Sequence, residues 1–229
     1  MANYVLLHGA YQGGWIWQRV TPHLRAAGHT VFAPSLDGCA ERRHALRPGI
    51  DTESQAAEIA ELLFFEDLKD IVLVGSSCGG MVACRVAELA RDRIGRIVLA
   101  DALALFNGES VADHVKRPTA VTTELATGPS REDAANRMFV SLDGPTKEWA
   151  LARCTPHPIA AMQAPVKLDS FWQQKWNASV IWCKQSVNPP VAHQRRARDT
   201  LNASWHELDT GHYPMLTEPE ALAKLMMAG

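Results

Sequence analysis

The most informative segment of this chain reads Val74-Gly75-Ser76-Ser77-Cys78-Gly79-Gly80. It follows the apolar run 71–74 and precedes a helical pattern, so we expect a buried strand, a G-x-S-x-G turn and a helix. Such a turn lifts one serine hydroxyl clear of the backbone, and the next amide points at a group bound there. An ordinary tight turn of small residues is the alternative. The context favours Ser77 as a nucleophile, with the Cys78 amide as half of an oxyanion hole.

Length and composition set the broad class. The 229 residues, 47% hydrophobic and 21% charged, suffice for one domain with a sizeable core. A net charge of −2 without a basic run argues against nucleic acid as a partner. We find no signal-peptide pattern and no apolar run that could span a bilayer, which argues against a membrane partner. Five scattered cysteines suggest reduced thiols and a cytoplasmic protein, and no motif supports a metal or another cofactor.

Short apolar runs alternate with helical patterns along the chain. The runs that predict strands are 4–8, 30–33, 71–74, 96–100, 179–183 and 204–208. Thr52 with Gln55, and Thr217 with Glu220, predict capping boxes at the starts of two helices. Because strands alternate with helices, we expect an α/β fold whose mostly parallel sheet has helices on both faces.

The segment between the fourth and fifth predicted strands is far longer than an ordinary connection. We interpret 103–175 as a cap subdomain and assign 1–102 and 176–229 to the core. Such a cap would lie over the carboxyl ends of the strands, where these sheets bind ligands. Extra core packing is the alternative, and it is the better explanation for any single large apolar side chain of the segment. These side chains are Phe106, Met138, Phe139, Trp149, Met162, Phe171 and Trp172.

A serine nucleophile needs a base to take its proton. Of nine histidines, only His212 follows the last predicted strand and directly precedes the final helix. We expect His212 to be that base, with a surface histidine as the alternative. The loop after the first strand reads His8-Gly9-Ala10-Tyr11-Gln12-Gly13-Gly14, and the amide of Ala10 would supply the second oxyanion donor. We expect His8 to be buried and to brace this loop.

Four blocks of the sequence resemble a known family. They are His8-Gly9-Ala10 through Trp15-Ile16-Trp17, Ser77-Cys78-Gly79-Gly80, Thr155-Pro156-His157-Pro158 and Gly211-His212-Tyr213-Pro214-Met215. They look like the small α/β-hydrolases related to plant methylesterases and hydroxynitrile lyases, including their bacterial esterase relatives. The resemblance runs nearly end to end. It implies an α/β-hydrolase fold with a six-stranded sheet and a helical cap. It also implies Ser77 and His212 as nucleophile and base, with an oxyanion hole formed by the amides of Ala10 and Cys78.

The chain departs from this family at the acid that orients the histidine. The family keeps that acid after the fifth strand, where this chain has Ser186 and no nearby carboxylate. The nearest replacement is Asp101, at the end of the adjacent fourth strand, where some haloalkane dehalogenases of this fold place their acid. We therefore predict the Asp101 carboxylate within hydrogen-bond reach of His212 Nδ1, or one water away from it. The alternative is that Asp101 caps the loop that leads into the cap.

A second departure bears on the reaction. Hydroxynitrile lyases of this kind carry a lysine after the histidine and a threonine in the first loop, where this chain has Tyr213 and Gly9. Cyanohydrin cleavage is therefore disfavoured. We expect a serine hydrolase that cleaves a small hydrophobic or aromatic ester through a Ser77 acyl-enzyme. Two alternatives stay open: cofactor-free lyase or isomerase chemistry at His212, and a ligand-binding protein with little turnover. The expected partner is a small-molecule substrate, and a homodimer is left open.

Overall fold

The computed structural model describes residues 1–115 and 121–228, so part of the predicted cap, 116–120, lies outside the described residues. Its main sheet has six strands in the order β2-β1-β3-β4-β8-β9, and every neighbouring pair is parallel. All six predicted strands are present. Their bounds are β1 Asn3–Leu7, β2 Thr30–Phe32, β3 Ile71–Ser77, β4 Ile94–Ala102, β8 Ala178–Cys183 and β9 Ser204–Leu208.

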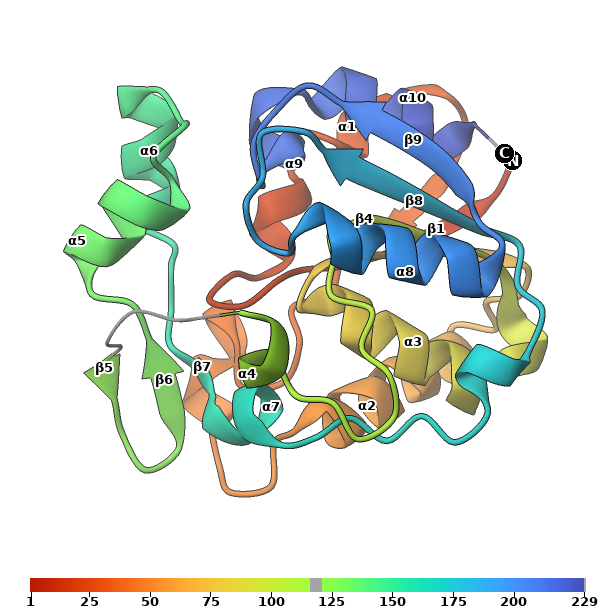
Figure 1. Ribbon diagram of the computed structural model, residues 1–229, viewed down its shortest axis with the longest axis horizontal. Helices are drawn as coiled ribbons and strands as arrows, with labels where there is room; N and C mark the ends of the chain where they lie inside the picture. Colours follow the sequence, from red (N-terminus) through yellow and green to blue (C-terminus); the bar gives the residue numbers. More distant parts are fainter. Residues whose placement is uncertain (116–120, 229) are drawn as a thin grey trace.

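Helices cover both faces of this sheet (Figure 1). One face carries α2 (Thr52–Phe65), α3 (Gly79–Leu89) and α8 (Val191–Leu201). The other carries α1 (Thr21–Ala26), α9 (Pro214–Thr217) and α10 (Pro219–Met227), together with the 3-10 helix Gly14–Trp17. Two short 3-10 helices, Ala40–Ala45 and Arg91–Arg93, complete the core connections. None of the helices in the described ranges is long and apolar enough to cross a lipid bilayer.

The strands alternate their side chains between two separate hydrophobic clusters. Val5 and Leu7 of β1 pack into the cluster under α2, α3 and α8, whereas Tyr4 and Leu6 pack into the cluster under α1, α9 and α10. This alternation follows from the period of two in an extended chain. The four inner strands are largely buried on both faces, so they appear in the sequence as mainly apolar runs, which explains why they could be predicted. The edge strands β2 and β9 are partly exposed.

The two predicted capping boxes are wrong. Helix α2 is capped by Asp51, whose carboxylate accepts from the Ser54 amide at 2.9 Å, while the Ser54 hydroxyl accepts from the Asp51 amide at 3.0 Å. Aspartate competes well with threonine for the first position of a helix. Helix α10 has no side-chain cap. Thr217 is the last residue of α9, its hydroxyl donates to the Tyr213 carbonyl at 3.1 Å, and the residue that precedes α10 is Glu218.

The middle of the long segment between β4 and β8, about residues 121–151, lies beyond the tips of the strand arrows of the main sheet, and the rest of the segment runs back along the core (Figure 1). The segment contains helices and also a small antiparallel sheet, β5-β6-β7, which the sequence did not predict. The elements are α4 Val111–His114, β5 Val121–Thr122, β6 Ala126–Gly128, α5 Arg131–Asp133, a π-helix at Ala134–Met138, α6 Gly144–Leu151, β7 His157–Pro158, α7 Ile159–Gln163 and a 3-10 helix at Phe171–Gln173.

Candidate active site

Ser77 lies at the point where β3 turns into α3. It is the last residue of β3, and α3 begins at Gly79. Its φ of +50° is in the left-handed region, which costs a non-glycine residue free energy and is typical of functional turns. The turn is also tightly packed: a Cβ on Gly75 would lie 2.6 Å from the Gly79 carbonyl oxygen. The structure therefore has the predicted strand, sharp turn and helix around Ser77.

The loop after β1 passes directly beside this serine. A Cβ on Gly9 would lie 2.7 Å from Ser77 Cβ, so only glycine fits this position without a shift. His8 is fully buried, as predicted, and donates from Nδ1 to the Gly9 carbonyl at 2.8 Å. Its Nε2 accepts from the Leu36 amide at 2.9 Å. Burial lowers the pKa of His8 to about 4, so this histidine is neutral and braces the loop.

His212 follows β9 and contacts a buried carboxylate. Its Nδ1 lies 2.5 Å from Asp101 Oδ2, and Asp101 is fully buried. The other carboxylate oxygen accepts from the Cys183 amide of β8 at 3.3 Å. Because a carboxylate only accepts, His212 donates from Nδ1 and keeps Nε2 free to accept a proton. The predicted contact is present, and the catalytic role of Asp101 stays a prediction.

A bulge in β4 places Asp101 behind the histidine. Ser76 pairs with Ala100 and Ser77 pairs with Ala102, so Asp101 is an extra residue opposite the end of β3. Its φ is +46°. A bulge of this kind redirects a side chain relative to the regular alternation of a strand. The end of β4 thereby directs the Asp101 carboxylate to His212.

Ser186, where the family resemblance implies the orienting acid, has a different environment. Its hydroxyl donates to the Asn188 carbonyl at 3.2 Å, and its side chain lines the cavity described next. The acid closest to His212 in sequence, Asp209, accepts from the side-chain amide of Gln185 at 3.3 Å.

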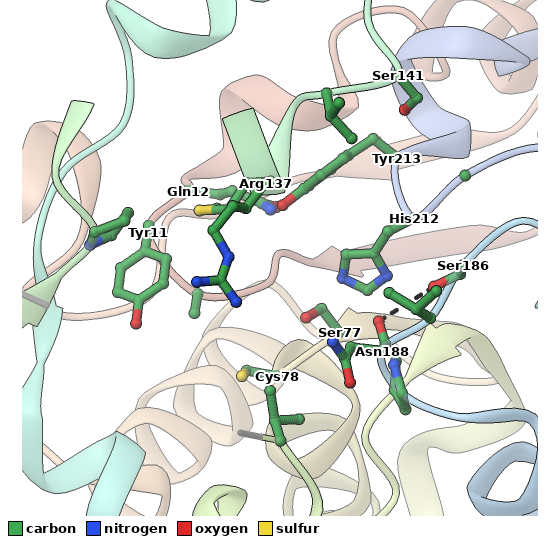
Figure 2. Close-up of a pocket in the computed structure, with 18 of the residues that line it drawn as sticks. Tyr11, Gln12, Ser77, Cys78, Arg137, Ser141, Ser186, Asn188, His212 and Tyr213 are labelled. Atoms are coloured by element: carbon green, nitrogen blue, oxygen red, sulfur yellow. Dashed lines mark hydrogen bonds between the residues drawn. The ribbon is translucent and has the colours of Figure 1, made fainter. Parts of the chain in front are cut away.

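Ser77 and His212 line one cavity of about 280 Å³ (Figure 2). Ala10 and Cys78 line it too, and their roles as oxyanion donors stay predictions. In Figure 2 the Ser77 side chain lies just below the His212 ring, and no hydrogen bond joins these two described residues. Hydrogen bonds of this kind are often long without a substrate and tighten when one is bound. The apolar part of the wall is formed by Leu103, Val115, Pro129, Met138, Val140, Val187 and Pro189.

Of the seven large apolar side chains noted in the cap segment, only Met138 lines this cavity. Phe139 and Phe171 are fully buried in the two core clusters, and the Phe106 ring packs on Trp172 at 4.3 Å. Packing thus explains most of them. The polar wall includes residues that the sequence did not single out: Tyr11, Gln12, Asp133, Arg137, Ser141, Gln185 and Asn188. The first two lie in the glycine-rich loop, which could have pointed to them, whereas Arg137 has no sequence signal.

In the described part of the chain, no group of three or more histidine, cysteine, aspartate or glutamate side chains could hold a metal ion. The chemistry that this arrangement supports comes from protein groups: a strained serine, a histidine with a free Nε2 and a carboxylate that holds its Nδ1.

Comparison with known proteins gives consistent matches. The chain is 30% identical to a carbendazim hydrolyzing esterase from a Nocardioides strain, over 73% of this chain and 74% of the relative. It is 30% identical to Methylesterase 3 of Arabidopsis thaliana, over 98% of this chain and 94% of the relative. The structure superposes with a TM-score of 0.85 on an extracellular alpha/beta-hydrolase from a Paenibacillus species, at 22% identity and covering 99% and 98% of the two chains.

The resemblance inferred from the motifs is therefore confirmed, as is the fold class. A hydroxynitrile lyase of Manihot esculenta is also similar, at 28% identity over 63% of this chain and 54% of the relative. The family model that matches residues 4–225 is described as the alpha/beta hydrolase family, and it covers nearly the whole chain. The chain belongs to the alpha/beta hydrolase family.

Proposed function

We propose that this protein is a serine hydrolase that cleaves a small carboxylic ester through an acyl-enzyme on Ser77. The observation that carries the proposal is the strained Ser77 turn beside His212, whose Nδ1 is held by Asp101 at 2.5 Å. Esterase and methylesterase relatives support ester hydrolysis as the reaction class. The five free cysteines support a cytoplasmic location, which we also propose.

In this mechanism Ser77 Oγ attacks the ester carbonyl while its proton moves to His212 Nε2. The amides of Ala10 and Cys78 stabilise the oxyanion that forms. When the intermediate collapses, the bond to the alcohol breaks and His212 returns the proton to the leaving oxygen. A water molecule then attacks the acyl-enzyme by the same route and releases the acid and free Ser77. Asp101 stabilises the imidazolium throughout and does not itself take the proton.

The cavity supports a small substrate with an apolar portion. Its volume of about 280 Å³ is near the lower end for small-molecule sites. Apolar side chains come both from the segment predicted as the cap, at Leu103, Met138 and Val140, and from the core, at Val187. Two tyrosines, Tyr11 and Tyr213, also line it and could contact an aromatic group.

Replacing the nucleophile tests the proposal. We expect Ser77→Ala to lower kcat/KM for p-nitrophenyl acetate by about a thousandfold or more, because the acyl-enzyme can no longer form. Labelling by a fluorophosphonate probe should disappear as well. The control is Ser76→Ala, since Ser76 is buried in the same strand and does not line the cavity. Activity of Ser77→Ala close to that of the unmodified protein would contradict the mechanism.

The same Ser77→Ala variant, assayed with a cyanohydrin, distinguishes hydrolysis from cyanohydrin cleavage. Gly9 leaves no room for the threonine of hydroxynitrile lyases, because a Cβ there would lie 2.7 Å from Ser77 Cβ. Burial raises the pKa of Tyr213, so its phenol stays neutral and offers no positive charge to a leaving cyanide. With mandelonitrile, we expect no more benzaldehyde from the unmodified protein than from Ser77→Ala. Clear Ser77-dependent release would favour the lyase alternative.

A further inference from the structure

Arg137 extends from the cap into the active-site cavity. It belongs to the π-helix Ala134–Met138, a wide turn that is uncommon in helices and frequent at functional sites. Both Arg137 and its neighbour Met138 line the cavity. Figure 2 shows the guanidinium between Tyr11 and His212, above Cys78. The side chain therefore lies where it could contact a substrate attached to Ser77.

This guanidinium has no anionic partner among the described residues. Asp133, four residues earlier, is the ordinary helical partner for an arginine. Its carboxylate instead accepts from the Ser130 hydroxyl at 2.7 Å, and the two side chains form no ion pair. The other arginines of the cap helices are engaged elsewhere: Arg131 pairs with Glu148 at 2.5 Å, and Arg153 lies 4.4 Å from the Trp149 ring centre.

Arg137 is the one arginine or lysine among the described residues that line the cavity. A guanidinium presents a planar fork of donors that matches a carboxylate in a bidentate pair. Asp133 lines the same wall, so the local charge suits a ligand with one negative charge better than a doubly charged phosphate. The apolar walls between the cap and Ser77 suit a short hydrocarbon chain.

We propose that the substrate carries a second, free carboxylate that Arg137 binds, so that the enzyme acts on monoesters of dicarboxylic acids. This inference rests on the ester hydrolysis proposed above and identifies its substrate class. The ester end lies at Ser77, the chain packs on the apolar wall, and the carboxylate reaches the cap. The Arg137 side chain is exposed. A carboxylate bound to it would form an ion pair with the guanidinium and shield this charge from solvent.

The test compares charged and neutral substrates of equal chain length. The monomethyl esters of succinic to suberic acid are assayed beside the corresponding dimethyl esters, and acid release is followed with a pH indicator. For the best chain length, we expect the unmodified enzyme to prefer the monoester by about tenfold or more in kcat/KM. In Arg137→Met this ratio should fall by about tenfold or more, and Arg137→Lys should lie between. Using a ratio within each variant cancels any general loss of activity.

The matched control is Arg131→Met, which removes the same charge from the same part of the cap without touching the cavity. Its ratio should equal that of the unmodified enzyme. If no chain length shows a preference for the monoester, or if Arg137→Met leaves the ratio unchanged, the proposal is overturned.

A binding measurement separates this inference from the proposed hydrolysis. Calorimetry with Ser77→Ala measures the dissociation constants of monomethyl and dimethyl adipate without turnover. We expect the monoester to bind about tenfold tighter, and this advantage should be lost in the Ser77→Ala, Arg137→Met double variant. If the unmodified protein cleaves no ester and this advantage is still found, the hydrolysis is wrong and the carboxylate site stands. Equal binding of the two ligands refutes the carboxylate site.

Discussion

Ser77 and Asp101 share an unusual backbone conformation. Both have a positive φ, +50° and +46°, and they lie at the adjacent ends of β3 and β4. Left-handed backbone at such residues costs on the order of 1 to 3 kcal/mol and persists only where the surroundings enforce it. Ser77 is the nucleophile of the proposed mechanism, and Asp101 holds His212 at 2.5 Å. The strained backbone is therefore found at two residues whose side chains must be oriented correctly for the proposed mechanism.

The position of Asp101 leads to a specific expectation for catalysis. Asp101→Asn should lower kcat for p-nitrophenyl acetate by about a thousandfold or more. An amide in place of the carboxylate can donate to Nδ1, which favours the wrong tautomer, and it removes the charge that stabilises the imidazolium. Thermal unfolding followed by circular dichroism checks that the fold is kept. Asp209→Asn is the control, because this acid bonds Gln185 instead of His212.

The same position allows a rescue experiment. Adding Ser186→Asp to Asp101→Asn restores a carboxylate where relatives keep theirs, and kcat should recover in part. If Asp101→Asn alone stays within about threefold of the unmodified enzyme, Asp101 is not the orienting acid and a Ser–His dyad is left.

Residues in short local motifs could be predicted, whereas residues placed by tertiary structure could not. Ser77 and His212 stand in recognisable segments, and both line the cavity. Arg137 lies in the long segment between β4 and β8, and no local motif in the sequence marks it as a cavity residue. Asp101 could be predicted in part. The sequence indicated its place at the end of a strand, but it did not indicate the bulge that directs its side chain.

At the level of elements, burial made the strands easy to predict and left the helix starts ambiguous. The inner strands β1, β3, β4 and β8 are largely buried on both faces, so each appears as a mainly apolar run. At the start of α2, three neighbouring residues could each accept an amide hydrogen: Asp51, Thr52 and Ser54. Sequence spacing alone could not choose between them. The structure chooses Asp51, with Ser54 as its reciprocal partner.

This cap has a measurable consequence for stability. Asp51→Ala should lower the free energy of unfolding by about 1 kcal/mol, because the Ser54 amide loses its acceptor. Thr52→Ala is the matched control and should cost less, since the Thr52 hydroxyl is buried without a hydrogen-bond partner among the described residues. Urea unfolding of the two variants measures the difference. An equal or larger loss in Thr52→Ala would contradict this role of Asp51.

In the molecule as a whole, two buried histidines each join two segments that are far apart in the sequence. Nε2 of His8 accepts from the Leu36 amide at 2.9 Å, and Nε2 of His193 accepts from the Ala104 amide at 3.0 Å. The first bond joins the end of β1 to the loop after β2. The second joins α8 to the start of the cap segment. Burial lowers the pKa of His8 to about 4. Burial, together with the nearby charge of Arg196, lowers the pKa of His193 to about 4 as well.

These pKa values make the protein sensitive to mild acid. An unfolded histidine has a pKa of about 6.5, so between about pH 6.5 and pH 4 the unfolded chain binds protons that the folded protein excludes. The free energy of unfolding should therefore be highest above about pH 6.5 and fall toward pH 4, by about 3 kcal/mol for each histidine. Glu109 extends this loss of stability to lower pH. Desolvation opposes ionisation of its carboxyl group, but hydrogen bonds from Arg196 and the Phe106 amide outweigh it and lower the pKa to about 2.

The contribution of a single histidine can be isolated by substitution. In His193→Gln the side-chain oxygen can still accept from the Ala104 amide, while the group that titrates is gone. Urea unfolding between about pH 7.5 and about pH 4.5 should then show a shallower pH dependence, with close to one proton fewer taken up on unfolding. His44→Gln is the control, because His44 is exposed and its removal should leave the slope unchanged. If the slope of His193→Gln equals that of the unmodified protein, His193 is protonated alike in the folded and unfolded states, and the acid sensitivity has another source.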